Sequence, residues 1–168
     1  MNSFKLYVYS FVARLLPESR GFGIKNALLR WAGAKIGRNV RVYSTVSILG
    51  SGSLEIGDDV HVGPGVIILS SQPAGIKIGS CVDIGPGVVI ANGTHEIDRK
   101  GPHIAGKGIA KQIVIGDGCW LGARVTILAC VELPRKTLVA AGAVVTKSVE
   151  GECRLVAGVP AEVKKAWR

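Results

Sequence analysis

The stretch "IGDGCWLGARVTILACVELPRKTLVAAGAVV", residues 115–145, decides the fold of this chain because it repeats with a period of six. An aliphatic residue returns at each sixth position: Ile115, Leu121, Ile127, Leu133, Val139 and Val145. Four residues after most of these comes another small or β-branched residue, such as Cys119 or Val125. A period of six matches neither a helix nor a single alternating strand. It indicates a short strand, a corner and another short strand, with the aliphatic side chain always pointing inward.

The same period runs through the sequence upstream of this stretch. Its aliphatic positions there are Ile36, Val42, Ile48, Ile56, Val62, Ile68, Ile78, Ile84 and Ile90. Three units close one round of a triangular prism, so coils of 18 residues begin at positions 36, 56, 78, 115 and 133. The separations of 20, 22, 37 and 18 residues leave insertions of 2, 4, 19 and 0. The longest insertion covers residues 96–114, and all three are expected to leave the prism along one edge.

The composition suits a core of stacked strands. The chain has 168 residues, enough for one domain with a sizeable core. Hydrophobic residues make up 48% but aromatic residues only 5%, so the core must consist of Val, Ile, Leu and Ala. The four cysteines show no metal-ligand spacing, which indicates small fillers in a reducing compartment. Without a signal peptide, we expect a cytoplasmic protein.

The net charge of +9 is concentrated at the N-terminus. Residues 1–41 hold eight Lys or Arg against one acid, Glu18, a net +7 that leaves +2 for the rest. A cationic helix with an apolar stripe indicates either a capping helix or an element that contacts a membrane surface. The apolar residues 6–16 are too short to span a bilayer, which takes ~20 residues, and Arg14 interrupts them. The sequence shows neither aromatics interleaved with the basic residues nor a known nucleic-acid-binding module, so we expect no nucleic-acid partner.

This pattern resembles the hexapeptide-repeat family, and that resemblance implies a left-handed parallel β-helix. We therefore expect an all-β fold of about five triangular coils at residues 35–150, with a protruding loop at 96–114. Residues 1–34 are predicted to form a helical cap over the open first coil, since the end of a repeat stack needs covering. Residues 151–168 are predicted to form a tail with a short C-terminal helix. The apolar stripes of the two capping helices are Leu6, Val8, Phe11, Val12 and Leu15, then Ile24, Ala27, Leu28 and Trp31.

The motif "GPGVVIANGTHEID" at residues 85–98, with the repeats after residue 114, resembles the maltose, galactoside and polysaccharide acetyltransferases. Those enzymes transfer an acetyl group from acetyl-CoA to a sugar hydroxyl, with no metal. The resemblance implies an O-acetyltransferase acting on a cell-surface polysaccharide or its precursor, and it identifies His95 as the general base. A neutral imidazole suits that role because it is well placed to take a hydroxyl proton near pH 7. The resemblance also implies a homotrimer, with sites between adjacent subunits.

Several polar residues are candidates for orienting His95 or binding the acceptor. Glu96 or Asp98 either orients the His95 ring or is a solvated loop charge, and Asn92 is a ligand or a corner residue. The sixth residues of the coils form a column, Arg41, His61, Asp83, Trp120 and Leu138. His61 and Asp83 in this column are acceptor-binding groups or plain surface polarity. Trp120 points outward and needs cover, either from a neighbouring subunit and the CoA arm or from the terminal helix.

The resemblance implies a lane for acetyl-CoA along one side of the prism. Its residues are Trp120, Gly122, Ala123, Ala141 and Gly142 beside the pantetheine arm, then Thr146, Lys147 and Lys164 near the nucleotide. A backbone N–H in this lane could polarise the thioester carbonyl. Two departures affect the implied substrate contacts: Gly65 replaces the acceptor-binding Asn of the small-sugar enzymes, and Glu162 replaces a terminal Arg.

Three alternatives stay open at this point. The chain could acetylate the amine of a nucleotide-linked amino sugar. It could be a zinc enzyme of the γ-carbonic-anhydrase kind, with His61, His95 and His103 as metal ligands. It could also be a prism that acts only as a scaffold.

Overall fold

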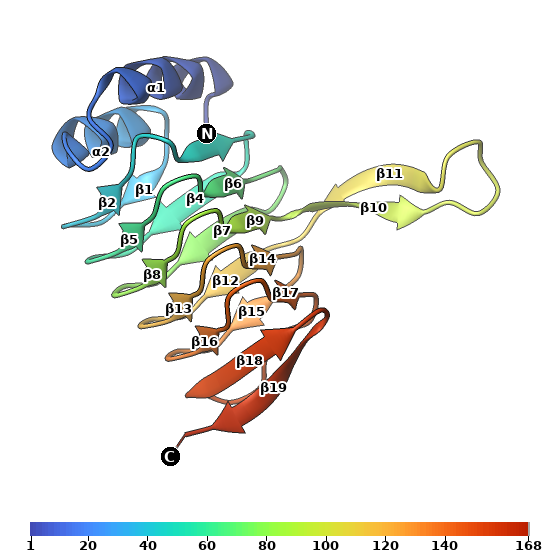
Figure 1. Cartoon of the computed structure of the whole chain (residues 1–168). Coiled ribbons are helices and arrows are strands. Elements are labelled where there is room, and N and C mark those ends of the chain that lie inside the picture. The colour runs from blue at the N-terminus through green and yellow to red at the C-terminus, as the bar shows by residue number, and fades with distance from the viewer. Residues whose placement is uncertain (168) are drawn as a thin grey trace.

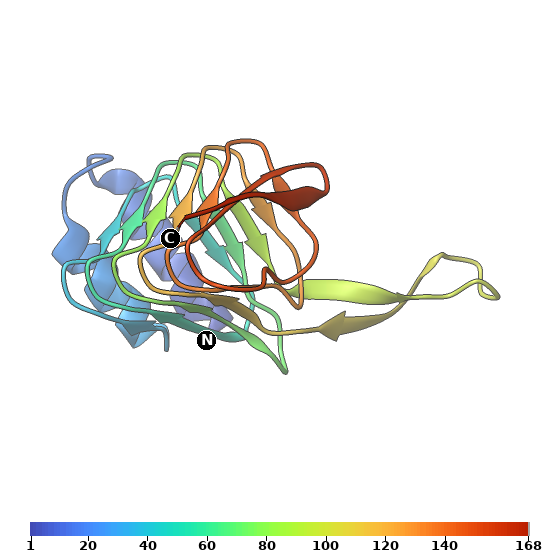
Figure 2. The same ribbon diagram turned by 90° about the horizontal axis from the view of Figure 1, so that it is seen from below.

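The periodic positions form the strands of a triangular prism. The computed structural model describes residues 1–167, and three parallel sheets make the three faces of the prism (Figures 1 and 2). The first face holds β1 (Lys35–Ile36), β4 (Ser53–Ile56), β7 (Gly75–Ile78), β12 (Ile113–Ile115) and β15 (Glu132–Leu133). The second holds β2 (Arg41–Val42), β5 (His61–Val62), β8 (Asp83–Ile84), β13 (Trp120–Leu121) and β16 (Leu138–Val139). The third holds β3 (Ser47–Leu49), β6 (Ile67–Leu69), β9 (Val89–Ala91), β14 (Thr126–Ile127) and β17 (Val144–Val145).

The prism interior is the hydrophobic core that the repeat predicts. Equivalent residues of successive coils pair directly, as Ile56 does with Ile78 and Ile68 with Ile90. Each of these four side chains is buried. The corners require a left-handed backbone, which glycine adopts at Gly65 and Gly87 and which non-glycine residues adopt elsewhere. Five coils therefore stack in register, as predicted.

Two helices cover the first coil, also as predicted. Helix α1 (Ser3–Leu15) packs on β3, and α2 (Phe22–Trp31) packs on β1 and β2 (Figure 1). The buried faces differ from the predicted stripes, because Phe11, Leu15, Ile24 and Trp31 are all exposed. The residues that α1 buries are Leu6, Tyr9 and Ala13, and those that α2 buries are Lys25, Asn26 and Leu29.

Hydrogen bonds explain why α2 turns polar residues inward. Asn26 Nδ2 donates to the Val40 carbonyl oxygen at 2.8 Å. The Lys25 ammonium donates to the Ser44 hydroxyl at 3.2 Å and to the Glu18 carbonyl oxygen at 3.3 Å. Burial lowers the pKa of Lys25. These bonds tie the helix to the first coil, and buried polar groups need such partners.

The break in the repeat is a β-hairpin that projects from the prism (Figures 1 and 2). Strand β10 (Gly93–Ile97) pairs antiparallel with β11 (Ala105–Ala110). The expected loop was 96–114. The hairpin starts three residues earlier, at Gly93, and its second strand ends at Ala110, because residues 113 and 114 already lie in β12. The insertion is therefore an ordered arm that leaves the edge between the third face and the next coil's first face.

The predicted C-terminal helix is wrong, because the tail forms two strands. Strand β18 (Arg154–Gly158) pairs in parallel with β16, and β19 (Ala161–Ala166) pairs antiparallel with β18. The free edge of the last coil explains this arrangement, since unpaired strand edges need cover. Val156 is buried opposite Val139. In residues 1–167, neither helix has the length and apolarity needed to cross a membrane.

Candidate active site

His95 lies on the projecting hairpin and is exposed to solvent. Its partner across the hairpin is Gly108, and a Cβ built there would lie 3.8 Å from His95 Nε2. The imidazole therefore leans over a position without a side chain. Within residues 1–167, no hydrogen bond or ion pair engages the His95 ring. Both ring nitrogens are thus open to a substrate or to a second subunit.

The residues around His95 have different environments. Glu96 is exposed and lies at an irregularity of the β10–β11 pairing, between the paired residues His95 and Ile97. Asp98 instead shapes the hairpin tip, accepting the backbone N–H groups of Lys100 and Gly101. These bonds lower the pKa of its carboxyl group.

Asn92 has a structural position at the base of the hairpin. Its side chain is fully buried, its Oδ1 accepts the Ser71 N–H at 2.6 Å, and its Nδ2 donates to the Ser71 carbonyl oxygen at 3.2 Å. The Asn92 carbonyl oxygen also accepts the Lys111 N–H. Asn92 therefore ties the base of the arm to the end of the second coil and is a corner residue. The sequence gives no signal for Ser71 as its partner.

The predicted column on the second face is confirmed. His61 pairs in register with Asp83, and Asp83 pairs with Trp120. His61 Nδ1 lies 3.9 Å from Asp83 Oδ1, and the Tyr43 ring, which the sequence did not single out, lies 5.2 Å from the His61 ring. His61, Asp83 and Trp120, but not Tyr43, line an open pocket of about 430 Å³ together with Gly63, Pro64, Ile84, Gly85 and Pro86. Trp120 keeps 56% of its surface exposed, since no terminal helix covers it.

Two backbone N–H groups lie free beside this pocket. The corner between the second and third faces carries a column of Ser44, Pro64, Pro86, Ala123 and Ala141. The Ser44 N–H is bonded to the Glu18 carbonyl oxygen, and proline has no N–H. The N–H groups of Ala123 and Ala141 donate to no acceptor within residues 1–167. They form a short row of donors with small side chains, as the predicted lane requires.

The backbone under this row is tightly packed. A Cβ at Gly122 would lie 2.6 Å from the Ala141 nitrogen, so only glycine fits there. Gly142 has a φ of 73° and donates its N–H to the Ala123 carbonyl oxygen. Two successive coils therefore hold each other at a fixed separation along the lane.

The predicted nucleotide-end residues lie near the C-terminal strands. Thr146 and Lys147 follow β17 and are exposed. Lys164 on β19 forms a 2.9 Å ion pair with Glu162, the residue that replaces the expected Arg. A phosphate there would have to compete with Glu162 for the Lys164 ammonium.

Cys119 lies in the core and not in the lane. It is 1% exposed, its Sγ contacts the Pro134 carbonyl oxygen at 3.2 Å, and burial raises the pKa of its thiol. A raised pKa disfavours the thiolate that a nucleophile needs. Within residues 1–167 of one chain, no group of three or more His, Cys, Asp or Glu residues is placed to hold a metal ion.

One chain does not bring His95 and the lane together. The hairpin that carries His95 leaves the prism after β9, at the edge between the third and first faces. Ala123 and Ala141 lie at a different edge, between the second and third faces. The hairpin extends away from the prism and not around it (Figure 2).

Comparisons with known proteins agree with this architecture. The family described as "Hexapeptide repeat of succinyl-transferase" matches residues 112–147. A comparison with curated proteins found no match. Among solved structures, a hexapeptide-repeat acetyltransferase from Vibrio cholerae O1 biovar eltor, complexed with acetyl coenzyme A, is 26% identical. Its TM-score is 0.73, over 97% of this chain and 87% of that one.

Two more distant structures share the fold. A maltose O-acetyltransferase from Clostridium difficile 630 is 20% identical, with a TM-score of 0.68 over 99% of this chain and 87% of that one. A single-residue variant of an N-acyltransferase from Bacillus cereus, in complex with dTDP and coenzyme A, is 17% identical. Its TM-score is 0.63, over 91% of this chain and 92% of that one. These matches confirm the predicted left-handed β-helix and the resemblance to hexapeptide-repeat acetyltransferases.

Proposed function

We propose that this protein is an acetyl-CoA-dependent O-acetyltransferase that acts on a sugar hydroxyl. The observation that carries the proposal is the pair of free N–H groups at Ala123 and Ala141, beside the exposed face of Trp120. An extended chain with amide groups, such as the pantetheine arm of CoA, needs donors in a row and a smooth surface. The Vibrio cholerae structure with the same fold holds acetyl coenzyme A, which supports this ligand.

In this proposal His95 is the general base of a direct transfer. Its neutral imidazole takes the proton of the acceptor hydroxyl while the oxygen attacks the thioester carbon. A lane N–H stabilises the negative charge that develops on the carbonyl oxygen. The carbon–sulfur bond then breaks, and the CoA thiolate takes the proton back from the imidazolium. The products are an acetyl ester and CoA thiol, with no covalent enzyme intermediate and no metal.

We further propose a homotrimer, because His95 and the lane lie on different edges of one prism. In a three-fold assembly the hairpin of one subunit can reach the lane of the next. The partner subunit would also cover Trp120. An acceptor bound between the two subunits would then contact the open ring nitrogens of His95.

For the acceptor we propose a glycan, namely a cell-surface polysaccharide or its precursor in the cytoplasm. Gly65 supports this over a small sugar, since its N–H bonds to Thr45 Oγ1 and it has no side chain to bind a hydroxyl. His61, Asp83 and Glu96 are the polar groups available for the acceptor. Contact with a membrane through the N-terminus is a separate proposal, which the exposed face of α1 supports.

The test is a thiol-release assay with acetyl-CoA against a panel of glycans, small sugars and nucleotide-linked amino sugars. We expect turnover with a hydroxyl acceptor and a stable ester as product. Turnover restricted to amino sugars would assign N-acetylation instead. Absence of CoA binding would favour the alternative that the protein acts only as a scaffold.

Two variants test the chemistry. His95→Gln should lower kcat by about 10²–10⁴-fold, the usual contribution of a general base, while acetyl-CoA binding stays unchanged. Cys119→Ala should keep wild-type turnover, because the buried thiol has no role. Full turnover in His95→Gln, or loss of turnover in Cys119→Ala, would overturn the mechanism.

A further inference from the structure

Helix α1 exposes an apolar stripe along its whole length. The residues Phe4, Tyr7, Phe11 and Leu15 follow the spacing of one helix face, three or four positions apart. Their exposed fractions are 71%, 71%, 60% and 71%. Because Leu6, Tyr9 and Ala13 already anchor the helix on the first coil, these four side chains, here called the aromatic stripe, are not needed for that packing.

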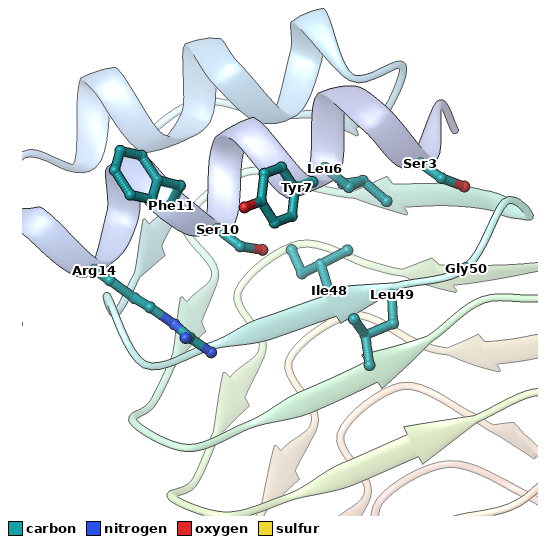
Figure 3. A pocket seen from close by; sticks show the side chains of 9 residues that line it. All are labelled: Ser3, Leu6, Tyr7, Ser10, Phe11, Arg14, Ile48, Leu49 and Gly50. Carbon is teal, nitrogen blue, oxygen red and sulfur yellow. The ribbon is translucent and has the colours of Figure 1, made fainter.

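A groove under α1 continues the stripe. It lies between α1 and β3 and has a volume of about 400 Å³. Figure 3 shows Tyr7, Phe11 and Arg14 on one side of α1, above Ile48 and Leu49 of β3. Leu49 is itself 48% exposed, so the apolar surface passes from the helix onto the prism. A surface of this kind on a monomer marks a binding site.

The charged side chains around the stripe are mainly cations. Arg14 lines the groove, Arg20 is exposed beyond the end of α1, and the Lys5 ammonium lies 4.8 Å from the centre of the Trp31 ring. Trp31 on α2 is also 48% exposed. The only acid in residues 1–41, Glu18, is hydrogen-bonded to the Thr45 hydroxyl. The cap therefore presents aromatic rings and an excess of cations together, with Glu18 as its one exposed acid.

We propose that the aromatic stripe and the groove of the helical cap dock onto an anionic phospholipid bilayer. Aromatic rings are favoured at the headgroup level, and anionic headgroups attract the neighbouring cations. A second copy docking through the same cap would instead bring like charges together. Helix α1 would lie in the plane of the membrane surface, with 13 residues and no need to cross it. The cap lies at the first coil, whereas β16 and β17, which flank the lane, lie toward the other end of the prism (Figure 1).

The test is sedimentation of the full-length protein with vesicles of phosphatidylcholine alone and with added phosphatidylglycerol. We expect binding that needs the anionic lipid and weakens as salt rises. The double variant Phe4→Ser, Phe11→Ser should weaken binding by at least about tenfold, since each ring loses its apolar burial. Arg14→Gln should weaken it by about fivefold, from one lost charge near the surface.

Matched controls lie at other surfaces of the prism. Val159→Ser removes an apolar side chain that is 72% exposed at the far end, and Lys77→Gln removes a cation from the first face. Both should bind vesicles as the wild type does. Acetyl transfer to a soluble acceptor should be unchanged in the stripe variant, so failure here is distinct from failure of the proposed function.

Three results would overturn the proposal. The first is no binding to either vesicle, and the second is equal binding by the wild type and the stripe variant. The third is a change in oligomeric state on gel filtration of the stripe variant, which would assign the stripe to a second copy of the chain.

Discussion

At the scale of single residues, Tyr9 has a hydroxyl group that the fold buries without a partner. The side chain is fully buried, and within residues 1–167 its hydroxyl makes no hydrogen bond. Tyr9→Phe should therefore raise the free energy of unfolding by about 1 kcal/mol, since it removes an unsatisfied polar group. Urea unfolding at neutral pH measures the change. Tyr7→Phe is the control, because its exposed hydroxyl is already solvated.

The same residue predicts a pH dependence. Burial raises the pKa of Tyr9 above its ordinary value of 10.0, so the folded state favours the neutral phenol. Below pH 10 the phenol is neutral in both states, and stability does not depend on its ionisation. Above pH 10 the unfolded tyrosine ionises first, so the free energy of unfolding falls as the pH rises. The wild type should lose stability above pH 10 more steeply than Tyr9→Phe. Parallel slopes for the two proteins would contradict the assignment to Tyr9.

Gly122 is a second residue whose identity is restricted by close packing. Gly122→Ala would place a Cβ 2.6 Å from the Ala141 nitrogen, so the backbone of the lane must move. We expect a loss of about 1–3 kcal/mol in unfolding free energy and weaker acetyl-CoA binding. Gly23→Ala in α2 is the control, since nothing lies within 4 Å of its added Cβ. It should leave stability equal or raise it by up to about 1 kcal/mol.

At the scale of elements, the hairpin can be shortened without touching the core. Replacing residues 98–104 with an Asn-Gly turn keeps His95 and the pairing of Ile97 with Ala105. The unfolding free energy should change by less than about 0.5 kcal/mol, since the removed residues are mostly exposed. Turnover should fall at least about tenfold if the tip closes the site of a neighbouring subunit. Wild-type turnover in this variant would show that the tip has no part in the site.

The elements also show how far the sequence could predict the structure. The core strands were predictable because each inward position repeats the same burial, as at Ile56 and Ile78. The buried faces of the capping helices were not, because Lys25 and Asn26 turn inward to hydrogen-bond acceptors on the first coil, and these contacts exist only once the helix packs on that coil. The strand β19 was mistaken for a helix because its pairing is set by a free edge that appears only once the coils have stacked.

At the scale of the whole molecule, the predicted site residues fall on separate parts of one chain. The column of His61, Asp83 and Trp120 could be located from the period alone, since equal coil positions stack. The distance between His95 and that column could not, because the Asn92 side chain at the base of the hairpin is held by the Ser71 backbone, a contact without a sequence signal. In the proposed trimer, a second prism would bring its lane to the His95 of the first.

Mixed trimers test this division directly. His95→Gln removes the base and leaves the lane, whereas Ala141→Trp blocks the lane and leaves the base; each should be inactive alone. If every site joins the hairpin of one subunit to the lane of the next, random mixing at equal amounts restores about a quarter of the sites. Thiol release after refolding the two variants together measures this. A site contained in one chain would give no recovery, and mixing each variant with wild type controls for reassembly.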